Sequence, residues 1–316
     1  MNDKNVVVLT GPTAVGKTAL SIALAKALDT GIISADSMQV YKYMDIGSAK
    51  ITPQEMDGIG HALVDVYEPD EAFHVVRFQH DAKEAMKRLW AQGRLPLIVG
   101  GTGFYIQALL YDIDFTAEDA DRTLREKYET IVREQGAQAL HEMLRAVDPQ
   151  SAADIHANNV KRVIRALEFY EKTGVPISSH NAAEREKASP YGFAYFVLTD
   201  RREKLYARID ARVDAMMEQG LLDEVKALKQ MGYTRDMVSM QGLGYKELLA
   251  YLDGECSLEE AVYIIKRDTR HFAKRQLTWF RRERDVIWVD KSAFGYDDQK
   301  ILSYMLEQIE KRGLRS

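Results

Sequence analysis

The segment that most constrains the fold is residues 11–18, GPTAVGKT, which fits the pattern G-x-x-x-x-G-K-[ST] in full. An apolar, β-branched run at residues 6–9 precedes it, and apolar residues at helical spacing follow it from 18 to 28. A strand, loop and helix in this order bind phosphate, because backbone N–H groups converge in the loop and the helix N-terminus favours negative charge. We therefore expect the loop to bind phosphate groups through Gly11, Thr13, Ala14, Val15, Gly16, Lys17 and Thr18. Lys17 would supply a positive charge, and the Thr18 hydroxyl would bind Mg²⁺.

Four further short apolar runs predict strands, at residues 32–33, 97–99, 196–198 and 286–289. Helical patterns separate these runs, which predicts an α/β fold with a parallel, P-loop NTPase-like sheet. Residues 116–189 contain no strand-like run, so we expect an all-helical insertion domain there. The core then comprises residues 1–115 and 190–316, with a helical C-terminal region. Residues 178–190 are polar and end in Pro, which predicts a return loop.

An acidic residue follows one predicted strand and is missing after another. Residues 97–99 lead into Gly-Gly-Thr-Gly with no carboxylate, whereas Asp36 follows the run at 32–33. Ligands of open α/β sheets bind at the carboxyl ends of the strands, so Asp36 and Thr102 should both face the phosphate loop. Asp36 could orient or deprotonate a nucleophile, and Thr102 could donate a hydrogen bond to a leaving oxygen. The competing interpretation is that both residues cap local structure, or that Asp36 lies in the outer shell of Mg²⁺.

Charge is unevenly distributed along the chain. The net charge is −5, yet residues 264–284 hold eight Lys or Arg against two acidic residues. A second basic cluster comprises Lys161, Arg162 and Arg165. Two basic helices suit a phosphodiester backbone, although solvated helix surface explains such runs equally simply. The single cysteine, Cys256, and the lack of a long apolar run predict a cytoplasmic protein without a membrane span.

Six motifs in order resemble the tRNA dimethylallyltransferase family, also called tRNA isopentenyltransferases, in their compact bacterial form. The motifs lie at residues 11–18 (GPTAVGKT), 33–41 (ISADSMQVY), 44–50 (MDIGSAK), 100–105 (GGTGFY), 241–247 (QGLGYKE) and 269–281 (TRHFAKRQLTWFR). The resemblance implies transfer of a dimethylallyl group from dimethylallyl diphosphate to N6 of the adenosine 3′-adjacent to the anticodon, with release of pyrophosphate. The loop at 11–18 would then hold a prenyl diphosphate, and the base would leave its stack to react.

The resemblance also implies roles for single residues. Asp36 would be the general base on N6, while Thr102 and Arg212 would contact the diphosphate together with the loop at 11–18. The implied tRNA contacts are Ser37, Met38, Gln39, Lys161, Arg162, Val163, Ile164, Arg165, Lys274 and Arg275, those at 161–165 reaching the anticodon loop. Mg²⁺ is the implied cofactor, and we expect a monomer.

Three positions depart from the usual pattern of the family: Val15 replaces Ser, Met38 replaces Arg or Lys, and Ser48 replaces Thr. Two other functions compete with the prenyl transferase. One is a P-loop kinase of small molecules or nucleosides, and the other is a non-enzymatic, nucleotide-gated RNA-binding protein. The acid-free strand end at Gly100 favours the transferase, because P-loop enzymes that use ATP usually carry a metal-binding acid there.

Overall fold

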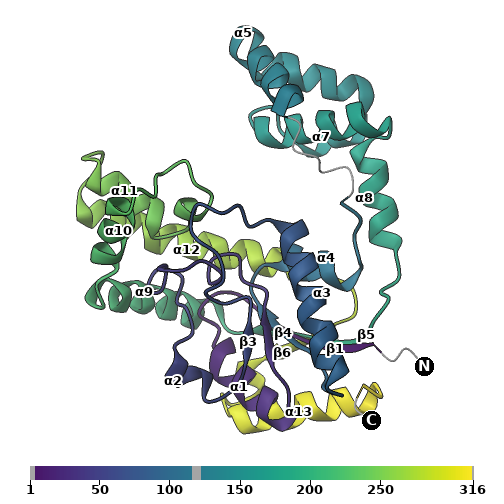
Figure 1. Cartoon of the computed structure of the whole chain (residues 1–316), viewed down its shortest axis with the longest axis vertical. Helices are drawn as coiled ribbons and strands as arrows, with labels where there is room; N and C mark the ends of the chain where they lie inside the picture. Colours follow the sequence, from purple (N-terminus) through teal and green to yellow (C-terminus); the bar gives the residue numbers. More distant parts are fainter. Residues whose placement is uncertain (1–3, 116–121, 315–316) are drawn as a thin grey trace. The chain divides into compact units, whose positions relative to one another are not determined.

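The chain folds into two compact units in the computed structural model (Figure 1), which describes residues 4–115 and 122–314. The first unit, here called the P-loop unit, comprises residues 1–110 and 190–316, and the second, the helical unit, comprises residues 111–189. The start of the expected insertion at residue 116 lies outside the described residues. Each unit has its own apolar core.

The P-loop unit is built on a six-stranded sheet in which all pairs are parallel and the order is β3-β2-β4-β1-β5-β6. Its strands are β1 (Asn5–Thr10), β2 (Ile32–Ser34), β3 (His61–Ala62), β4 (Leu97–Gly100), β5 (Gly192–Thr199) and β6 (Val286–Asp290). The β1 strand lies inside the sheet between β4 and β5, and its residues from Val6 to Thr10 are fully buried. A strand buried on both faces explains the uninterrupted apolar run in the sequence. The loop at 11–18 therefore starts from the interior of the sheet.

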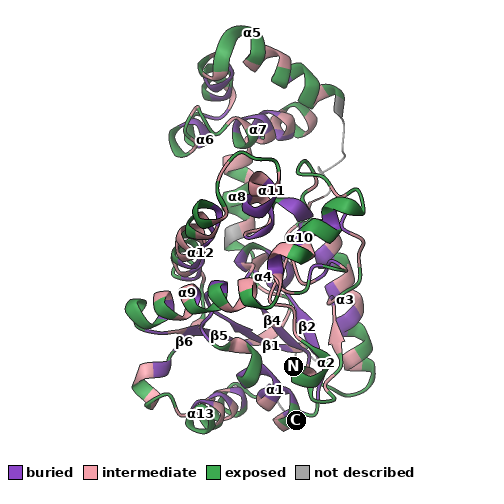
Figure 2. Ribbon diagram, turned by 90° about the vertical axis from the view of Figure 1, so that its left-hand side faces the viewer, coloured by how far each residue is buried: buried purple, intermediate pink, exposed green. Residues whose placement is uncertain are grey.

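Helices cover both faces of this sheet (Figure 2). Those of the P-loop unit are α1 (Lys17–Ala27), α2 (Pro53–Met56), α3 (Val75–Ala91), α4 (Gly103–Leu110), α9 (Arg202–Glu218), α10 (Leu221–Gln230), α11 (Tyr245–Leu252), α12 (Leu258–Phe280) and α13 (Asp298–Lys311), with 3₁₀ turns η1 (Ser239–Gln241) and η2 (Lys291–Phe294). The α1 and α13 helices pack together against one face, and α3 and α4 cover the other. Long α12 contacts α4, α9 and α11, which places it over the carboxyl ends of the strands.

The helical unit contains α5 (Arg122–Val147), α6 (Pro149–Asp154), α7 (Val160–Thr173) and α8 (Ile177–Glu186). Its core forms where α5 packs against α7, around the buried side chains of Tyr128, Leu140, Leu144 and Leu167. Asp148 ties α8 to α6, because its carboxylate accepts hydrogen bonds from Ser151 and Ser178. These hydrogen bonds hold the pKa of Asp148 below its usual value despite its burial. Nothing in this unit as described is a strand, as the sequence predicts.

The expected fold class is confirmed, with two local differences. The five predicted strands all form, but the sequence gives no signal for β3, which is two residues long at the edge of the sheet. The predicted return loop at 178–190 is wrong, because α8 occupies most of it. Pro176 at the helix start and the hydrogen bonds of Ser178 to Asp148 allow this polar segment to form a helix. No helix in the described ranges is long and apolar enough to cross a membrane.

Candidate active site

The loop at 11–18 adopts a conformation that needs its glycines. Gly11 has φ +148°, and a Cβ there would lie 2.6 Å from the carbonyl oxygen of Leu198 on β5. Gly16, which precedes α1, has φ +95°, in the left-handed region that L side chains rarely adopt. Val15 departs from the expected Ser, and its side chain is buried in the core of the unit. The loop therefore has the geometry of a phosphate-binding nest without a hydroxyl at position 15.

Lys17 bends back over the loop that precedes it. Its Nζ donates hydrogen bonds to the carbonyl oxygens of Gly11 and Pro12, each at 2.9 Å. Burial lowers the pKa of Lys17 to about 8; the carboxylate of Asp36 opposes this shift and the guanidinium of Arg212 adds to it. Lys17, Asp36 and Arg212 therefore lie close enough to share one electrostatic environment, as expected for a site that binds an anion. A bound anion would favour the charged form of Lys17 and so oppose the effect of burial.

Asp36 faces the phosphate loop from the end of β2. It lines a small cavity of about 60 Å³ together with Lys17, Thr18 and Gln39. Its Oδ1 accepts hydrogen bonds from the backbone N–H groups of Met38 (2.9 Å) and Gln39 (3.3 Å). Its Oδ2 makes no hydrogen bond within the described part of the chain. Asp36 thus caps its own turn with one oxygen, as the competing interpretation holds, and keeps the other for a ligand.

The turn after β4 lies close to the turn that carries Asp36. A Cβ on Gly100 would lie 2.2 Å from the carbonyl oxygen of Ala35, so only glycine fits there. The N–H of Thr102 donates to the same carbonyl at 3.2 Å. The carbonyl of Thr102 accepts the first hydrogen bonds of α4, from Tyr105 and Ile106, so Thr102 occupies the N-cap position of that helix. Its hydroxyl appears in no hydrogen bond within the described residues.

Two side chains that the sequence analysis did not select hold the phosphate loop. Gln276 of α12 accepts a hydrogen bond from the N–H of Thr13 at 2.9 Å. Arg208 of α9 donates to the carbonyl oxygen of Ala14 at 3.0 Å and forms an ion pair of 2.6 Å with the fully buried carboxylate of Asp200. The N–H of Thr13 is thereby engaged within the chain, and the contact of Thr13 with phosphate stays a prediction. No sequence pattern joins these residues, which are up to 263 positions apart.

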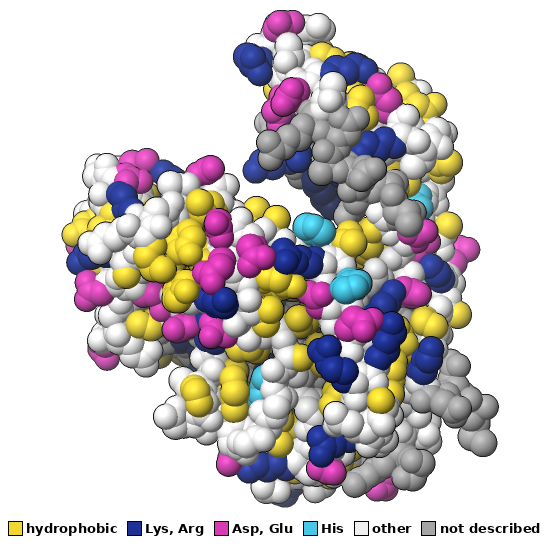
Figure 3. All heavy atoms as spheres, viewed as in Figure 1, with side chains coloured by type: hydrophobic (Ala, Val, Ile, Leu, Met, Phe, Trp, Pro, Cys, Tyr) yellow, Lys and Arg dark blue, Asp and Glu magenta, His cyan; other side chains and the backbone are white. Residues whose placement is uncertain are grey.

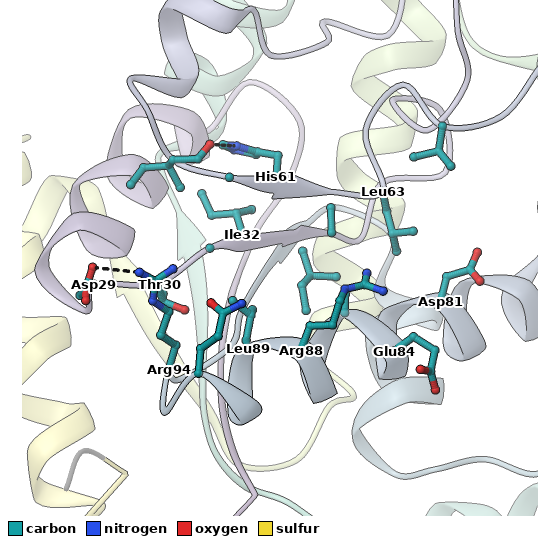
Figure 4. Close-up of a pocket in the computed structure, with 18 of the residues that line it drawn as sticks. Asp29, Thr30, Ile32, His61, Leu63, Asp81, Glu84, Arg88, Leu89 and Arg94 are labelled. Carbon is teal, nitrogen blue, oxygen red and sulfur yellow. Dashed lines mark hydrogen bonds and ion pairs between the residues drawn. The ribbon is translucent and has the colours of Figure 1, made fainter.

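The small cavity combines polar and apolar walls. Beside Lys17, Thr18 and Asp36 it is lined by a group of aliphatic side chains, namely Ile32, Ile51, Val64 and Val99. A larger cavity of about 720 Å³ lies between β2, β3 and α3 (Figure 4). Its lining mixes cations such as Arg88 and Arg94 with acids such as Asp81 and contains no residue of the loop at 11–18. The smaller cavity therefore holds the groups that suit phosphate chemistry.

The motifs at 44–50 and 241–247 dock against each other. Glu224 of α10 accepts hydrogen bonds from the backbone N–H groups of Asp45, Ile46 and Gly47, and from the hydroxyl of Tyr245. A Cβ on Gly47 would lie 2.5 Å from the ring of Tyr245. Met38 packs in the same region, because its methyl would lie 2.5 Å from a Cβ on Gly242. The two motifs therefore build the wall beside residues 36–39, of which Ser37, Met38 and Gln39 are partly exposed.

The basic cluster of the helical unit lies on α7. Lys161 and Arg162 are exposed, and Arg165 is partly exposed. Val163 and Ile164 are essentially fully buried in the core of the unit, so the prediction that they contact RNA is wrong for their side chains. The amphipathic helix thus separates a basic outer face from an apolar inner face.

The basic cluster of α12 is partly neutralised by its neighbours. Arg270 is ion-paired with Asp210, and Lys266 with Asp214 at 2.6 Å, both acids lying on α9. Arg267 pairs with Asp268 on its own helix. Lys274 and Arg275, further along, are exposed and have no ion pair in the described structure. Figure 3 shows the general pattern, in which Lys and Arg (dark blue) alternate with Asp and Glu (magenta) over the visible face.

The protein-family model of IPP transferase matches residues 39–283 of the chain. Two curated relatives are called tRNA dimethylallyltransferase. That of Lachnoclostridium phytofermentans is 58% identical over 97% of this chain and 97% of its own length. That of Acetivibrio thermocellus is 50% identical over 96% of this chain and 97% of its own length.

Solved structures show the same relationship. A full-length tRNA isopentenylpyrophosphate transferase from Bacillus halodurans is 44% identical, with a TM-score of 0.74 and coverage of 98% of both chains. A eukaryotic dimethylallyltransferase solved acting on tRNA is 32% identical, with a TM-score of 0.78, covering 91% of this chain and 74% of its own. The similarity therefore extends over both units of the chain.

Proposed function

The chain belongs to the IPP transferase family, and from this membership and the geometry of the phosphate loop we propose that it prenylates tRNA. The reaction is transfer of a dimethylallyl group from dimethylallyl diphosphate to N6 of the adenosine 3′-adjacent to the anticodon, with release of pyrophosphate. The observation that carries the proposal is the small cavity, where Lys17 and Asp36 lie beside the aliphatic side chains of Ile32 and Val99. A prenyl diphosphate needs such a combination of a cationic and an apolar wall.

The diphosphate would be bound by the backbone N–H groups of residues 14–18 and by the charges of Lys17 and Arg212. Negative charge grows on the diphosphate as the bond between its oxygen and the prenyl C1 breaks. Fixed donors and cations around the loop stabilise that charge without reorganising. Thr102, whose turn lies beside Asp36, would donate its hydroxyl to the leaving diphosphate.

Mg²⁺ fits the oxygen ligands at this site. The Thr18 hydroxyl lines the small cavity, and the described residues contain no cluster of three or more His, Cys, Asp or Glu that could hold a metal. Mg²⁺ is typically bound by one or two protein oxygens together with substrate phosphates and water. When bound, the ion would neutralise diphosphate charge next to Thr18.

Asp36 would act as the general base. Its free Oδ2 would accept the proton from N6 as the nitrogen attacks the prenyl C1 and the C–O bond to the diphosphate breaks. The two backbone N–H groups on Oδ1 fix the carboxylate in place. Positioning by such hydrogen bonds favours a single orientation of the base toward its substrate.

The tRNA would contact both units. On the P-loop unit, Ser37, Met38 and Gln39 lie beside the base, and Lys274 and Arg275 lie on the exposed surface of α12. On the helical unit, Lys161, Arg162 and Arg165 of α7 would bind anticodon-loop phosphates. A monomeric, cytoplasmic enzyme remains our expectation.

The test is incubation of the protein with Mg²⁺, unmodified tRNA and radiolabelled dimethylallyl diphosphate, with a parallel reaction containing ATP. The proposal predicts label in tRNA and no phosphate release from ATP. Phosphate loss from ATP without label in tRNA would favour the kinase.

A further inference from the structure

We propose that Gln276 is a positioning residue that sets the phosphate loop at a fixed distance from the turn that carries Thr102. The residue does not contact substrate; it acts through the backbone of the two segments that do. This inference rests on the proposed function for the identity of the substrate, but its geometry concerns only the diphosphate site.

Gln276 connects two loops that come from different strands. Its Oε1 accepts the N–H of Thr13, and its Nε2 donates to the carbonyl oxygen of Gly101, each at 2.9 Å. Only this orientation of the amide satisfies both partners, since one is a donor and the other an acceptor. Gln276 is buried, with 7% of the residue exposed, so water cannot replace its amide at low cost.

The Gln276 amide lies in close contact with the turn at 100–103. A Cβ on Gly101 would lie 2.4 Å from its Nε2, and a Cβ on Gly103 would lie 2.3 Å from the ring of Trp279. Gln276 and Trp279 are three residues apart on one face of α12. Gly101 and Gly103 therefore allow the close approach of α12, which explains part of the motif at 269–281.

The connection continues to the residue proposed as base. Thr102, next to Gly101, donates its N–H to the carbonyl oxygen of Ala35, which directly precedes Asp36. Hydrogen bonds thus run from the phosphate loop through Gln276 to the turn of Thr102 and on to the turn of Asp36. Loss of Gln276 would leave the Thr13 N–H and the Gly101 carbonyl unsatisfied and free the phosphate loop to shift.

The first experiment measures the affinity of Mg²⁺-pyrophosphate by calorimetry, which requires neither tRNA nor a prenyl group. We expect Gln276→Ala to bind pyrophosphate roughly ten-fold more weakly than the wild type. It should also lower kcat, with an unchanged Kd for tRNA. Gln276→Glu keeps the volume and the acceptor for Thr13 but loses the donor to Gly101, and so tests the connection if the alanine variant does not fold.

Gln79→Ala is the matched control. Gln79 is also buried and donates to a backbone carbonyl at 2.9 Å, but its partner is Ala108 of α4, away from the phosphate loop. We expect this variant to lower Tm and to retain wild-type affinity for pyrophosphate. The inference would be contradicted if both Gln276 variants bound pyrophosphate as tightly as the wild type. It would also be contradicted if Gln79→Ala lost as much pyrophosphate affinity as Gln276→Ala, because Gln276 would then be merely structural.

A double-mutant cycle gives an independent test. The Cβ of Gly101→Ala displaces the Gln276 amide in the wild type but meets no amide in Gln276→Ala. The two substitutions should therefore be less than additive in pyrophosphate affinity. Full additivity would contradict the inference. If the two substitutions are less than additive but the protein transfers no prenyl group to tRNA, the proposed function is wrong while the inference about Gln276 stands.

Discussion

On α7, Lys161 and Arg162 project into solvent from a helix whose other face is the core of the helical unit, whereas on α12 Lys266 and Arg270 are ion-paired with acids of α9. Both helices carry dense basic runs in the sequence. The exposed side chains of Lys161 and Arg162 on α7 are available to a polyanion. On α12, the neighbouring acids neutralise Lys266 and Arg270. Only the later part of α12, with Lys274 and Arg275, resembles α7.

The difference shows that a basic run does not define a binding surface until the neighbouring acids are known. Asp210 and Asp214 lie on another helix, about 50 residues or more before their partners in the chain. Partly exposed ion pairs contribute little to stability, but they remove local positive charge. We therefore propose that RNA binds to α7 and the later part of α12, and that the earlier part of α12 anchors the helix to α9.

The largest expected effect is on kcat, from a substitution of Asp36 that should leave tRNA binding unchanged. Asp36→Asn keeps the turn and one acceptor oxygen but removes the proposed base, so kcat should fall by roughly 10²–10⁴-fold. The Kd for tRNA should stay unchanged, in contrast to substitutions on α7. Single-turnover kinetics with tRNA and dimethylallyl diphosphate measure this; a wild-type rate would remove Asp36 from the mechanism.

The second prediction concerns the exposed cluster of α7. Replacement of both Lys161 and Arg162 by Ala should weaken tRNA binding roughly ten-fold and reduce the slope of log K against log salt by about 1.5, because two phosphate contacts are lost. The affinity for pyrophosphate should not change. Binding titrations over a range of salt concentrations measure both quantities, and an unchanged slope would show that α7 does not touch RNA.

The third prediction uses the pKa of Lys17, which burial lowers to about 8. In the unfolded chain this pKa lies near 10.5. Between about pH 8 and 10.5 the unfolded state therefore binds more protons than the folded state. The cost in stability of burying Lys17 becomes smaller as the pH rises through this range. Pyrophosphate needs the charged lysine, so its affinity should fall roughly five-fold between pH 8 and 9. Calorimetry should show proton uptake on binding. Lys17→Arg, charged throughout, should lose this part of the pH dependence; an identical profile in both proteins would contradict the assignment.

The smallest expected effect concerns the earlier part of α12, where the cations are ion-paired. Because Lys266 is neutralised by Asp214, Lys266→Ala should change tRNA affinity by less than about two-fold. Lys274→Ala, on the same helix but without an ion pair in the described structure, is the matched comparison and should weaken binding more. If the two substitutions changed tRNA affinity equally, the distinction between the earlier and later parts of α12 would be wrong.

The sequence predicts the structural elements that depend on residues close together in the chain. The strand, loop and helix at residues 5–27 follow from one continuous pattern, and the glycines at 11 and 16 occupy the positions that need them. The two-residue β3 escaped prediction because it is defined by its pairing with β2 and not by its own composition. The helix α8 escaped because Asp148, 30 residues earlier, stabilises its first turn.

The candidate site divides in the same way. Lys17 could be selected from the G-x-x-x-x-G-K-[ST] pattern. Asp36 and Thr102 could be selected because each lies just after a strand, and parallel strands bring their carboxyl ends together. Gln276 lies in the motif at 269–281, but neither it nor Arg208 could be assigned to the phosphate loop, because their partners in the loop lie 263 and 194 residues away. The burial of Val163 and Ile164 follows from helical periodicity, which separates them from the basic residues around them.

The central claim is that the phosphate loop delivers a prenyl group to one adenosine of tRNA. The most direct test is nucleoside mass spectrometry of unmodified tRNA after reaction with this protein, Mg²⁺ and dimethylallyl diphosphate, followed by mapping of the modified position. We predict dimethylallyl-adenosine at the position 3′-adjacent to the anticodon, and its absence from the Asp36→Asn reaction. Unmodified tRNA, or a prenyl group on another nucleoside, would contradict the account.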